Sequence, residues 1–350
     1  MARVPPLEHF SITVDKTVDF HAKFLCTIYG VKICVTTDSK RAKEHIITLL
    51  NGLPSSSSSA SSEADIELDI FTRAGSLQDP HLPPYVERAL EPRSLFKTHR
   101  TKDKCYVVLG NSWLCLSLKN RTGIGVLEES IWSYHWIILQ HFFLGGLCLL
   151  LRTCGRFLFH AAGLEHNGKG YLILGKSGAG KSTTTLSLVR HGWKYLGDDA
   201  LLLHQAGSHI EAFGIPVNFK ADDQTTNRLF KNINENLAIK ITHDANFPYF
   251  SKRYLMIDKL YPNQFKGHSI PNFLLFTRPT SQEKSELALM RKSEALKGVI
   301  EASPHFSLDS DNVDLLSTLV RQTTAYQLLA GKDVFENPRG FEELLLNGCQ

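Results

Sequence analysis

Apolar and polar residues alternate along the first part of the chain in the pattern that is typical of β-strands. Phe10–Val14 and Ala64–Phe71 alternate as half-buried strands do, and Val31–Thr37 is rich in β-branched residues. Cys105–Leu118 has the pattern of a hairpin that turns at Gly110-Asn111. The pattern therefore predicts a small, strand-rich region at the start of the chain.

A low-complexity segment interrupts this region. Residues 54–62 are nearly all serine and lack the apolar side chains needed to pack, so we expect a flexible loop or linker there. We place the strand-rich region at residues 1–130, and we find no catalytic constellation in it.

The pattern changes near Ile131, where a long apolar segment begins. Trp132–Leu151 is long enough to cross a bilayer, but it contains His135, Gln140 and His141, which would be costly in lipid. We therefore expect a buried helix and no membrane association.

Strand, turn and helix signals then follow closely. They predict a strand over FLFHAAGL, a tight turn at Asn167-Gly168, a buried strand at Tyr171–Leu174, a helix from about Lys181 to His191, and a strand over KYLGDDALLL. Together they predict an α/β (mixed α+β) fold with a second domain at residues 131–350.

Composition narrows the class of protein. The 350 residues are 43% hydrophobic and 21% charged, which is ordinary for a soluble globular protein. A formal net charge of +4 without a Lys/Arg run does not favour nucleic-acid binding.

The seven cysteines are scattered and include no CxxC pair, so free thiols are expected rather than zinc sites or disulfides. With no secretory signal at the N-terminus, we expect a cytoplasmic protein.

The most specific motif is a glycine-rich loop that matches GxxxxGK[ST] between a strand and a helix. Its glycines let successive N–H groups point inward at phosphate oxygens, and the start of the helix favours the same anion. Lys181 would reach the β- and γ-phosphates, and the Ser182 hydroxyl would ligate Mg²⁺. The expected nucleotide-binding residues are Gly175, Lys176, Ser177, Gly178, Ala179, Gly180, Lys181, Ser182 and Thr183.

Asp198-Asp199 follow Lys181 by 17 and 18 residues, within the next predicted strand segment. Carboxylates beside a phosphate-binding loop can hold Mg²⁺ or accept the proton of an attacking hydroxyl. Two adjacent carboxylates repel each other, so a metal ion or a lysine nearby is needed to keep both ionised.

Other candidates carry weaker signals. His160 lies 21 residues before Lys181, and a single histidine in an apolar strand is more often a core residue than a functional one. Lys220 and Arg278 each end a predicted strand; they can face phosphate, but most such cations are surface residues. His243-Asp244 lies in a loop-like stretch and can contact substrate.

The block from His160 to Asp199 resembles the HPr kinase/phosphorylase family and its looser relatives. That family shares its nucleotide-binding core with ATP-dependent phosphoenolpyruvate carboxykinase. The shared pattern is a strand ending in His, a hairpin, a loop ending in GKS, a helix, and a strand ending in paired aspartates. Weaker similarity extends through Ala212–Lys220, Phe273–Arg278 and Tyr326–Asp333, but the first 130 residues or so do not resemble the bacterial enzyme.

The resemblance implies roles for individual residues. His160 would orient the reacting groups, Asp198 would be the general base, and Asp199 would assist at the metal, with Glu211 as a second metal ligand. The chain departs from the family at Thr183-Thr184-Thr185, where Glu is frequent, and at Glu211-Ala-Phe-Gly214, which lacks a basic residue. These departures weaken the prediction of the substrate, and especially of the carrier protein HPr, but they do not affect the prediction of nucleotide binding.

The leading hypothesis is therefore an ATP- and Mg²⁺-dependent kinase that phosphorylates a Ser-type hydroxyl of a protein or peptide. A kinase of a small-molecule hydroxyl, a transporter-type ATPase module and a nucleotide-binding regulator without transfer activity are the alternatives. The chain has neither an LSGGQ-type signature nor an apolar strand ending in Asp-Glu, and it lacks the NKxD motif of GTPases. Because the bacterial relatives assemble into oligomers, a homo-oligomer is a further expectation.

Overall fold

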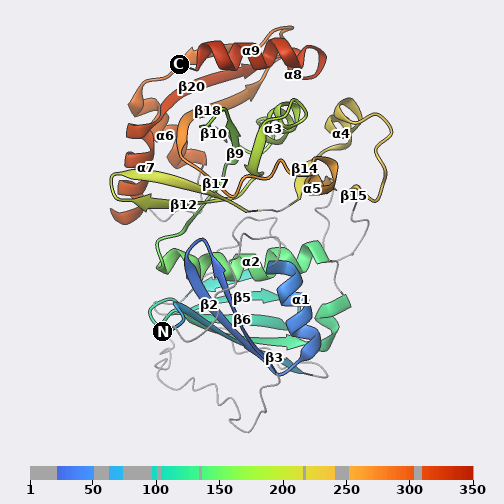
Figure 1. Ribbon diagram of the computed structural model, residues 1–350, viewed down its shortest axis with the longest axis vertical. Helices are drawn as coiled ribbons and strands as arrows, with labels where there is room; N and C mark the ends of the chain where they lie inside the picture. Colours follow the sequence, from blue (N-terminus) through green and yellow to red (C-terminus); the bar gives the residue numbers. More distant parts are fainter. Residues whose placement is uncertain are drawn as a thin grey trace, which may run out of the picture.

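The computed structural model describes residues 22–50, 63–73, 97–100, 104–133, 136–215, 218–240, 252–302 and 310–349. These residues form helices and four β-sheets, which confirms the predicted mixed α/β fold. Figure 1 shows an N-terminal part built on the largest sheet and a C-terminal part that contains the other three. The predicted strand Phe10–Val14, the serine-rich segment 54–62 and His243-Asp244 lie outside the described residues.

A seven-stranded sheet with the order β1-β2-β3-β7-β6-β5-β4 forms the N-terminal part. β1 and β2 make an antiparallel hairpin, β2, β3 and β7 run parallel, and β4 to β7 form an antiparallel meander. The predicted strands that became β2 and β3 and the predicted turn at Gly110-Asn111 are confirmed. The elements are β1 (Ala22–Ile28), β2 (Val31–Thr37), α1 (Lys40–Leu50), β3 (Ile66–Arg73), β4 (Lys97–Arg100), β5 (Lys104–Leu109), β6 (Ser112–Ser117) and β7 (Thr122–Glu128).

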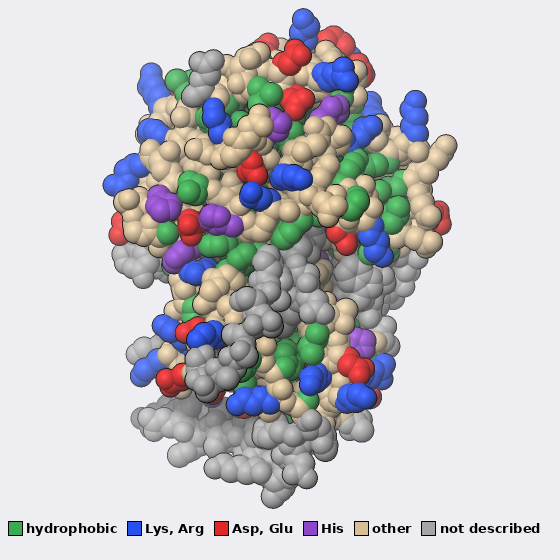
Figure 2. All heavy atoms as spheres, in the orientation of Figure 1, with side chains coloured by type: hydrophobic (Ala, Val, Ile, Leu, Met, Phe, Trp, Pro, Cys, Tyr) green, Lys and Arg blue, Asp and Glu red, His purple; other side chains and the backbone are tan. Residues whose placement is uncertain are grey.

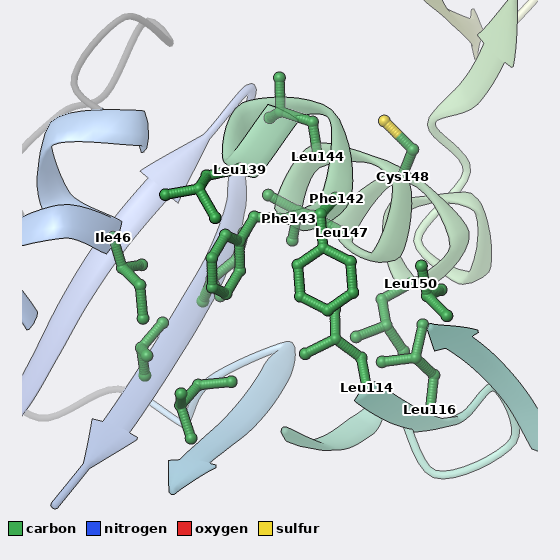
Figure 3. Close-up of a cluster of buried hydrophobic side chains, with 14 of the residues drawn as sticks. Ile46, Leu114, Leu116, Leu139, Phe142, Phe143, Leu144, Leu147, Cys148 and Leu150 are labelled. Atoms are coloured by element: carbon green, nitrogen blue, oxygen red, sulfur yellow. The ribbon is translucent and has the colours of Figure 1, made fainter. Parts of the chain in front are cut away.

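The long apolar segment forms helix α2 (Trp136–Thr153), which follows the short 3₁₀ helix η1 (Glu129–Ser133). Phe142 and Leu150 of α2 are fully buried in the core that the helix shares with the sheet (Figure 3). A Cβ atom on Gly146 would lie 2.6 Å from Leu114 Cδ1, so glycine at this position lets the helix approach the sheet closely. The segment is a core helix, as predicted. Across the described ranges, every helix is too short or too polar to cross a membrane.

The packing of α2 bears on the boundary predicted after residue 130. The apolar side chains of α2 share one core with β2, β3, β5 and β6, and the chain then turns at Gly155 (φ 72°) toward the C-terminal part. We therefore propose that the N-terminal part extends to Cys154. The same core includes Leu202, Ile215 and Tyr254, so the two parts pack directly on each other.

The tip of the β1–β2 hairpin also joins the two parts. Tyr29 (φ 48°) and Gly30 (φ 82°) adopt the left-handed conformations of a two-residue turn. The Tyr29 hydroxyl donates a hydrogen bond to the Gly214 carbonyl, and Arg156 Nη2 donates to the Tyr29 carbonyl at 2.8 Å. The rings of Tyr29 and Phe213 lie 4.6 Å apart. The hairpin tip is thereby attached to the C-terminal part.

A six-stranded sheet with the order β11-β9-β10-β18-β20-β19 organises the C-terminal part. β10, β18 and β20 are parallel, and β11 and β10 are both antiparallel to β9, so β10 and β11 end at the same edge of the sheet. The strands are β9 (Ala162–His166), β10 (Lys169–Leu174), β11 (Lys194–Gly197), β18 (Pro271–Pro279), β19 (Glu286–Leu289) and β20 (Thr324–Ala330).

Helices cover both faces of this sheet. Alternate residues of β10 enter two different cores: Tyr171 and Ile173 pack in the core that contains α3 and α9, and Leu172 and Leu174 pack in the core that contains α6 and α7. The helices of the C-terminal part are α3 (Lys181–Val189), α4 (Asp223–Leu229), α5 (Ile257–Leu260), α6 (Lys292–Ala302), α7 (Ser310–Gln322), α8 (Asp333–Glu336) and α9 (Pro338–Gly348).

Two smaller sheets flank the six-stranded one. The four-stranded sheet has the order β17-β13-β12-β8, and the three-stranded sheet has the order β14-β16-β15. Their strands are β8 (Phe157–Phe159), β12 (Leu201–Ala206), β13 (His209–Gly214), β17 (His268–Ser269), β14 (Phe219–Ala221), β15 (Ala238–Lys240) and β16 (Arg253–Leu255).

Two predicted strands are each divided in the structure. FLFHAAGL forms β8 of the four-stranded sheet and β9 of the six-stranded sheet, with His160 and Ala161 between them. KYLGDDALLL likewise forms β11 and β12, with Asp198 to Ala200 between them. Both predictions of a single strand are wrong, because each segment passes from one sheet to another at a short link.

The burial of Phe142 allows a test of how α2 packs. Replacement of this fully buried side chain in Phe142→Ala should lower the free energy of unfolding by about 3–5 kcal/mol, since it removes apolar contacts and leaves a cavity. Urea unfolding followed by circular dichroism measures the loss. Leu289→Ala is the control, because Leu289 is 71% exposed and its truncation should cost less than about 0.5 kcal/mol. Equal losses in the two variants would contradict this packing.

Candidate active site

The glycine-rich loop lies between β10 and α3, as predicted. Gly175, Gly178 and Gly180 have φ angles of 153°, 82° and 87°, which favour glycine over any other residue. A Cβ atom on Gly175 would also lie 2.7 Å from the Cβ of Ala179. The loop therefore curls back on itself directly before α3 begins at Lys181.

Lys181 and Ser182 point from the first turn of α3 toward the aspartate pair. The Lys181 side chain is only 5% exposed; its Nζ donates a hydrogen bond to the Gly175 carbonyl at 2.9 Å and lies 3.7 Å from Asp199 Oδ1. The Ser182 hydroxyl donates to the Asp198 carboxylate, with Oγ 2.8 Å from Oδ2 and 3.0 Å from Oδ1. The loop and the two aspartates thus form one site.

The two links between the sheets explain why these residues meet. Phe159 of β8 pairs with Leu201 of β12, and Gly163 of β9 pairs with Gly197 of β11. The residues between these pairs, His160-Ala161 and Asp198 to Ala200, therefore face each other where both segments change sheet. A Cβ atom on Gly197 would lie 2.8 Å from the Ala200 carbonyl oxygen, so this link can be tight only with glycine before the aspartates.

Asp198 is the buried member of the pair. It is 2% exposed, and it accepts a hydrogen bond from the Lys220 backbone N–H at 3.2 Å in addition to that from Ser182. Burial and then the charge of Asp199 raise the pKa of Asp198 to about 7, although the two hydrogen bonds and the charge of Lys181 act in the opposite direction. The surroundings of this carboxylate therefore compensate its burial only in part.

Asp199 has a different environment. Its φ angle of 66° is left-handed, which turns its side chain toward Lys181 and His160 rather than toward Ser182. Burial acts to raise its pKa, but the charges of Lys220, Lys181, His160 and Lys252 outweigh that effect and lower it. Asp199 is therefore an ionised carboxylate surrounded by cations.

A hydrogen bond from its ring to the backbone of Asp199 holds His160 beside that residue. The ring atom Nδ1 lies 2.8 Å from the Asp199 carbonyl, and because a carbonyl can only accept, Nδ1 carries the proton. The other ring nitrogen, Nε2, lies 4.0 Å from Asp199 Oδ1. A hydroxyl group could therefore be oriented between Nε2 and the carboxylate.

Other predicted residues lie further from this centre. Glu211 contacts His268 at 3.3 Å and His209 at 3.8 Å, and its cross-strand partner is His204, three residue pairs along the β12–β13 hairpin from Leu201. Figure 2 shows a group of histidine side chains around an acidic one on this face of the C-terminal part. Within the described ranges, the ion-pair partners of Glu211 are these two histidines and not the residues around Asp199, so its metal role stays a prediction.

The remaining loop and strand residues are more exposed. Lys176 extends toward Glu301 (Nζ to Oε2 3.9 Å), and Ser177 and Gly178 are exposed at the tip of the loop. The Thr183 hydroxyl lies 3.2 Å from that of Thr225 on α4, and Arg278 is exposed near the end of β18, which runs beside β10. In the described part of the chain, no group of three or more His, Cys, Asp or Glu side chains is arranged to hold a metal ion.

Sequence reasoning missed two residues of the site, Lys252 and Tyr254. The charge of Lys252 acts on Asp199, and Asp199 in turn contributes to raising the pKa of Tyr254, after burial. Tyr254 lies in β16 of the three-stranded sheet, whose strands have only three residues each, and Lys252 directly precedes that strand. No motif marks them, because strands this short leave no periodic pattern in the sequence.

Comparison with known proteins gives local matches. No family model matches the chain. A 43-residue segment is 44% identical to the HPr kinase/phosphorylase of Malacoplasma penetrans, and it covers 12% of this chain and 14% of that protein. A 51-residue segment is 43% identical to the HPr kinase/phosphorylase of Mycoplasma mycoides subsp. mycoides, and it covers 15% and 16% of the two chains. The chain contains an HPr-kinase-like segment.

These matches confirm the resemblance predicted from the sequence, and they span less than a fifth of the length of either relative. The solved structure of the Hpr(Ser) kinase/phosphatase from Coxiella burnetii aligns with 55% of this chain and 95% of its own. Its sequence identity is 14% and the TM-score is 0.28, which is too low to relate the two site geometries.

The environment of Asp198 predicts a pH dependence of stability. A carboxyl whose pKa is about 7 when folded and about 4 when unfolded stabilises the fold below pH 4 and loses that contribution as the pH rises to 7. Without divalent cations, Asp198→Asn should remove this loss, which is on the order of 2–4 kcal/mol between pH 4.5 and pH 8.

Chemical unfolding of both proteins at several pH values in EDTA measures this difference. The exposed Asp314 supplies the control, and Asp314→Asn should keep the pH dependence of the original protein. The expected environment of Asp198 is wrong if Asp198→Asn and the original protein lose stability in parallel as the pH rises.

Proposed function

We propose that this protein is an ATP- and Mg²⁺-dependent kinase that transfers the γ-phosphate to a Ser-type hydroxyl of a protein or peptide. One observation carries the proposal: the two links between sheets hold the carboxylates of Asp198 and Asp199 against Ser182 and Lys181 of the glycine-rich loop. The HPr-kinase-like segment supports the same class of reaction.

The loop supplies the nucleotide site of this proposal. The curled backbone from Gly175 to Gly180 and the first N–H groups of α3 would surround the phosphates. Lys181 would exchange its bond to the Gly175 carbonyl for the β- and γ-phosphate oxygens.

The residues present fit a magnesium ion next to Ser182. The Asp198 carboxylate is buried and lies within hydrogen-bond distance of the Ser182 hydroxyl, and its burial and the charge of Asp199 raise its pKa. Ser182 and Asp198 are therefore the residues that would hold Mg²⁺, and the ion, when bound, would neutralise phosphate charge. This assignment reverses the one implied by the resemblance, in which Asp198 is the base and Asp199 the metal ligand.

Asp199 is correspondingly the residue that faces the acceptor. The acceptor hydroxyl would lie between Asp199 and Nε2 of His160, its oxygen would attack the γ-phosphorus, and its proton would pass to Asp199 as the bond to ADP breaks. The lowered pKa of Asp199 makes it a weak base, which suits phosphoryl transfer, because a loose transition state demands orientation more than proton removal.

The acceptor defines the alternatives to this proposal. The names of the two relatives specify HPr, and the chain matches only a small share of either one. A hydroxyl of a protein or peptide remains the proposed acceptor, a small-molecule hydroxyl is the second candidate, and assembly into a homo-oligomer is proposed from the resemblance. ATP hydrolysis without an acceptor would instead indicate an ATPase or a regulatory module.

Incubation with γ-labelled ATP, Mg²⁺ and cell extract tests the proposal. The label should move to a hydroxyl of a macromolecule, and Asp199→Asn should lower that transfer by about 10²-fold or more while the affinity for Mg²⁺-ATP changes less than about threefold.

A second variant tests the nucleotide site. Lys181→Met should weaken ATP binding at least tenfold, as measured by titration with Mg²⁺-ATP, since it removes the cation that contacts the phosphates.

The same assay distinguishes the roles of the two aspartates. Asp198→Asn should raise the Mg²⁺ concentration needed for half-maximal transfer, and Asp199→Asn should leave it near the original value. Asp314→Asn is the control for the loss of one surface carboxylate. Release of free phosphate alone from every extract, or equal transfer by Asp199→Asn, would overturn the kinase proposal.

A further inference from the structure

The three-stranded sheet brings a lysine to the aspartate pair from outside the glycine-rich loop. Lys220, in the middle of β14, donates its backbone N–H to Asp198 Oδ2 at 3.2 Å, and its charge acts on Asp199 more strongly than that of Lys181. Lys220 therefore lies beside both carboxylates, on an element that the loop does not include.

The Lys220 ammonium has no carboxylate partner of its own. Among the described residues, it makes no ion pair within 4.0 Å, whereas Lys240 on β15 of the same sheet pairs with Asp223 at 3.0 Å. The ammonium instead lies over the ring of Tyr254, 5.9 Å from its centroid. A partly buried cation held by an aromatic face keeps its charge available for an anionic ligand.

Tyr254 fixes where this cation can lie. Lys220 and Tyr254 are direct cross-strand partners in β14 and β16, and Tyr254 is only 5% exposed. The Tyr254 ring also meets the ring of His141 of α2 in an edge-to-face contact, with centroids 6.3 Å apart. Helix α2 of the N-terminal part therefore supports the ring that carries Lys220.

The position of Lys220 suits the transition state of phosphoryl transfer. Lys181 approaches the aspartates from the loop side, and Lys220 approaches them from β14. In the transition state, the negatively charged phosphoryl group lies between the nucleotide and the acceptor. A fixed cation at this place stabilises the transition state more than the bound ATP.

We propose that Lys220 is a catalytic residue whose ammonium contacts the phosphoryl group during transfer, and that Tyr254 is the residue that positions it. This inference rests on the proposed kinase function. In the reaction, the acceptor oxygen forms its bond to the γ-phosphorus, the bond from that phosphorus to the ADP oxygen breaks, and the acceptor proton passes to Asp199, while Lys220 acts through its charge alone.

Comparison of ground-state and transition-state binding tests the role of Lys220. The probes are Mg²⁺-ATP and Mg²⁺-ADP with aluminium fluoride, which imitates the planar phosphoryl group, and the variants are Lys220→Met and Lys220→Arg. Lys220→Met should change the affinity for Mg²⁺-ATP less than about threefold, and it should weaken the aluminium fluoride complex and the rate of transfer by about 10²-fold. Lys220→Arg should recover at least tenfold of that loss because it restores the charge.

Lys240→Met is the matched control, since it removes a cation from the same sheet that is paired with Asp223 at the surface. Melting temperatures of all variants show whether they fold. Equal weakening of both complexes by Lys220→Met, or no weakening of either, would overturn the role of Lys220 while the original protein still transfers phosphate. If the original protein neither transfers phosphate nor binds aluminium fluoride with ADP, the kinase proposal fails, and the role of Lys220 fails with it.

Variants of Tyr254 test the positioning role. Tyr254→Leu removes the aromatic face and should lower kcat about tenfold or more with little change in the KM for ATP, and Tyr254→Phe should restore most of kcat. In the double variant Lys220→Met/Tyr254→Leu, the loss should not exceed that of Lys220→Met alone, because both changes remove the same cation. Additive losses would overturn the assignment of Tyr254.

Discussion

The candidate site depends on one constraint, which is that two chain segments pass between the same two sheets at the same place. β8 and β12 are partners in one sheet, and β9 and β11 are partners in the next, so the residues that join them must lie opposite each other. The strand pairing alone therefore brings His160 to the aspartates, and no contact between their side chains is needed to place them. It also sets the aspartates at the edge of the six-stranded sheet where β10 ends and the glycine-rich loop begins.

The electrostatic consequence is a site that is incomplete without a ligand. Burying two adjacent carboxylates is unfavourable, and the protein compensates them unequally. The charges of four cationic side chains act on Asp199, whereas Asp198 has two hydrogen-bond donors and, among the described residues, makes no ion pair within 4.0 Å. In the proposed function, a divalent cation beside Asp198 would offset the free energy that burial of this carboxylate costs, so the same burial that destabilises the fold would strengthen the site.

The sequence was a good guide wherever the chemistry is local. GxxxxGK[ST] predicted the glycine-rich loop and the start of α3, because both follow from contacts between neighbours along the chain. The turn at Asn167-Gly168 was predicted for the same reason. The division of FLFHAAGL and KYLGDDALLL was missed, since the links at His160 and at Asp198-Asp199 are short and have apolar strand residues on both sides.

The distinct environments of the two aspartates were also beyond the reach of the sequence. Adjacent residues of one type are indistinguishable until the backbone turns, and here the left-handed conformation of Asp199 separates their environments. Lys252 and Tyr254 were missed because three-residue strands leave no pattern, and the association of α2 with the N-terminal sheet was missed because an apolar helix does not specify its partner.

The attachment of the β1–β2 hairpin tip at Gly214 has a mechanical consequence. Tyr29 is hydrogen-bonded on both sides, by its hydroxyl to Gly214 and by its carbonyl to Arg156, and α2 adds a broad apolar contact with Leu202 and Tyr254. The two sets of contacts restrain each other, because a rotation of the two parts about one set would strain the other. A hinge motion that separates the two parts would have to break both sets of contacts.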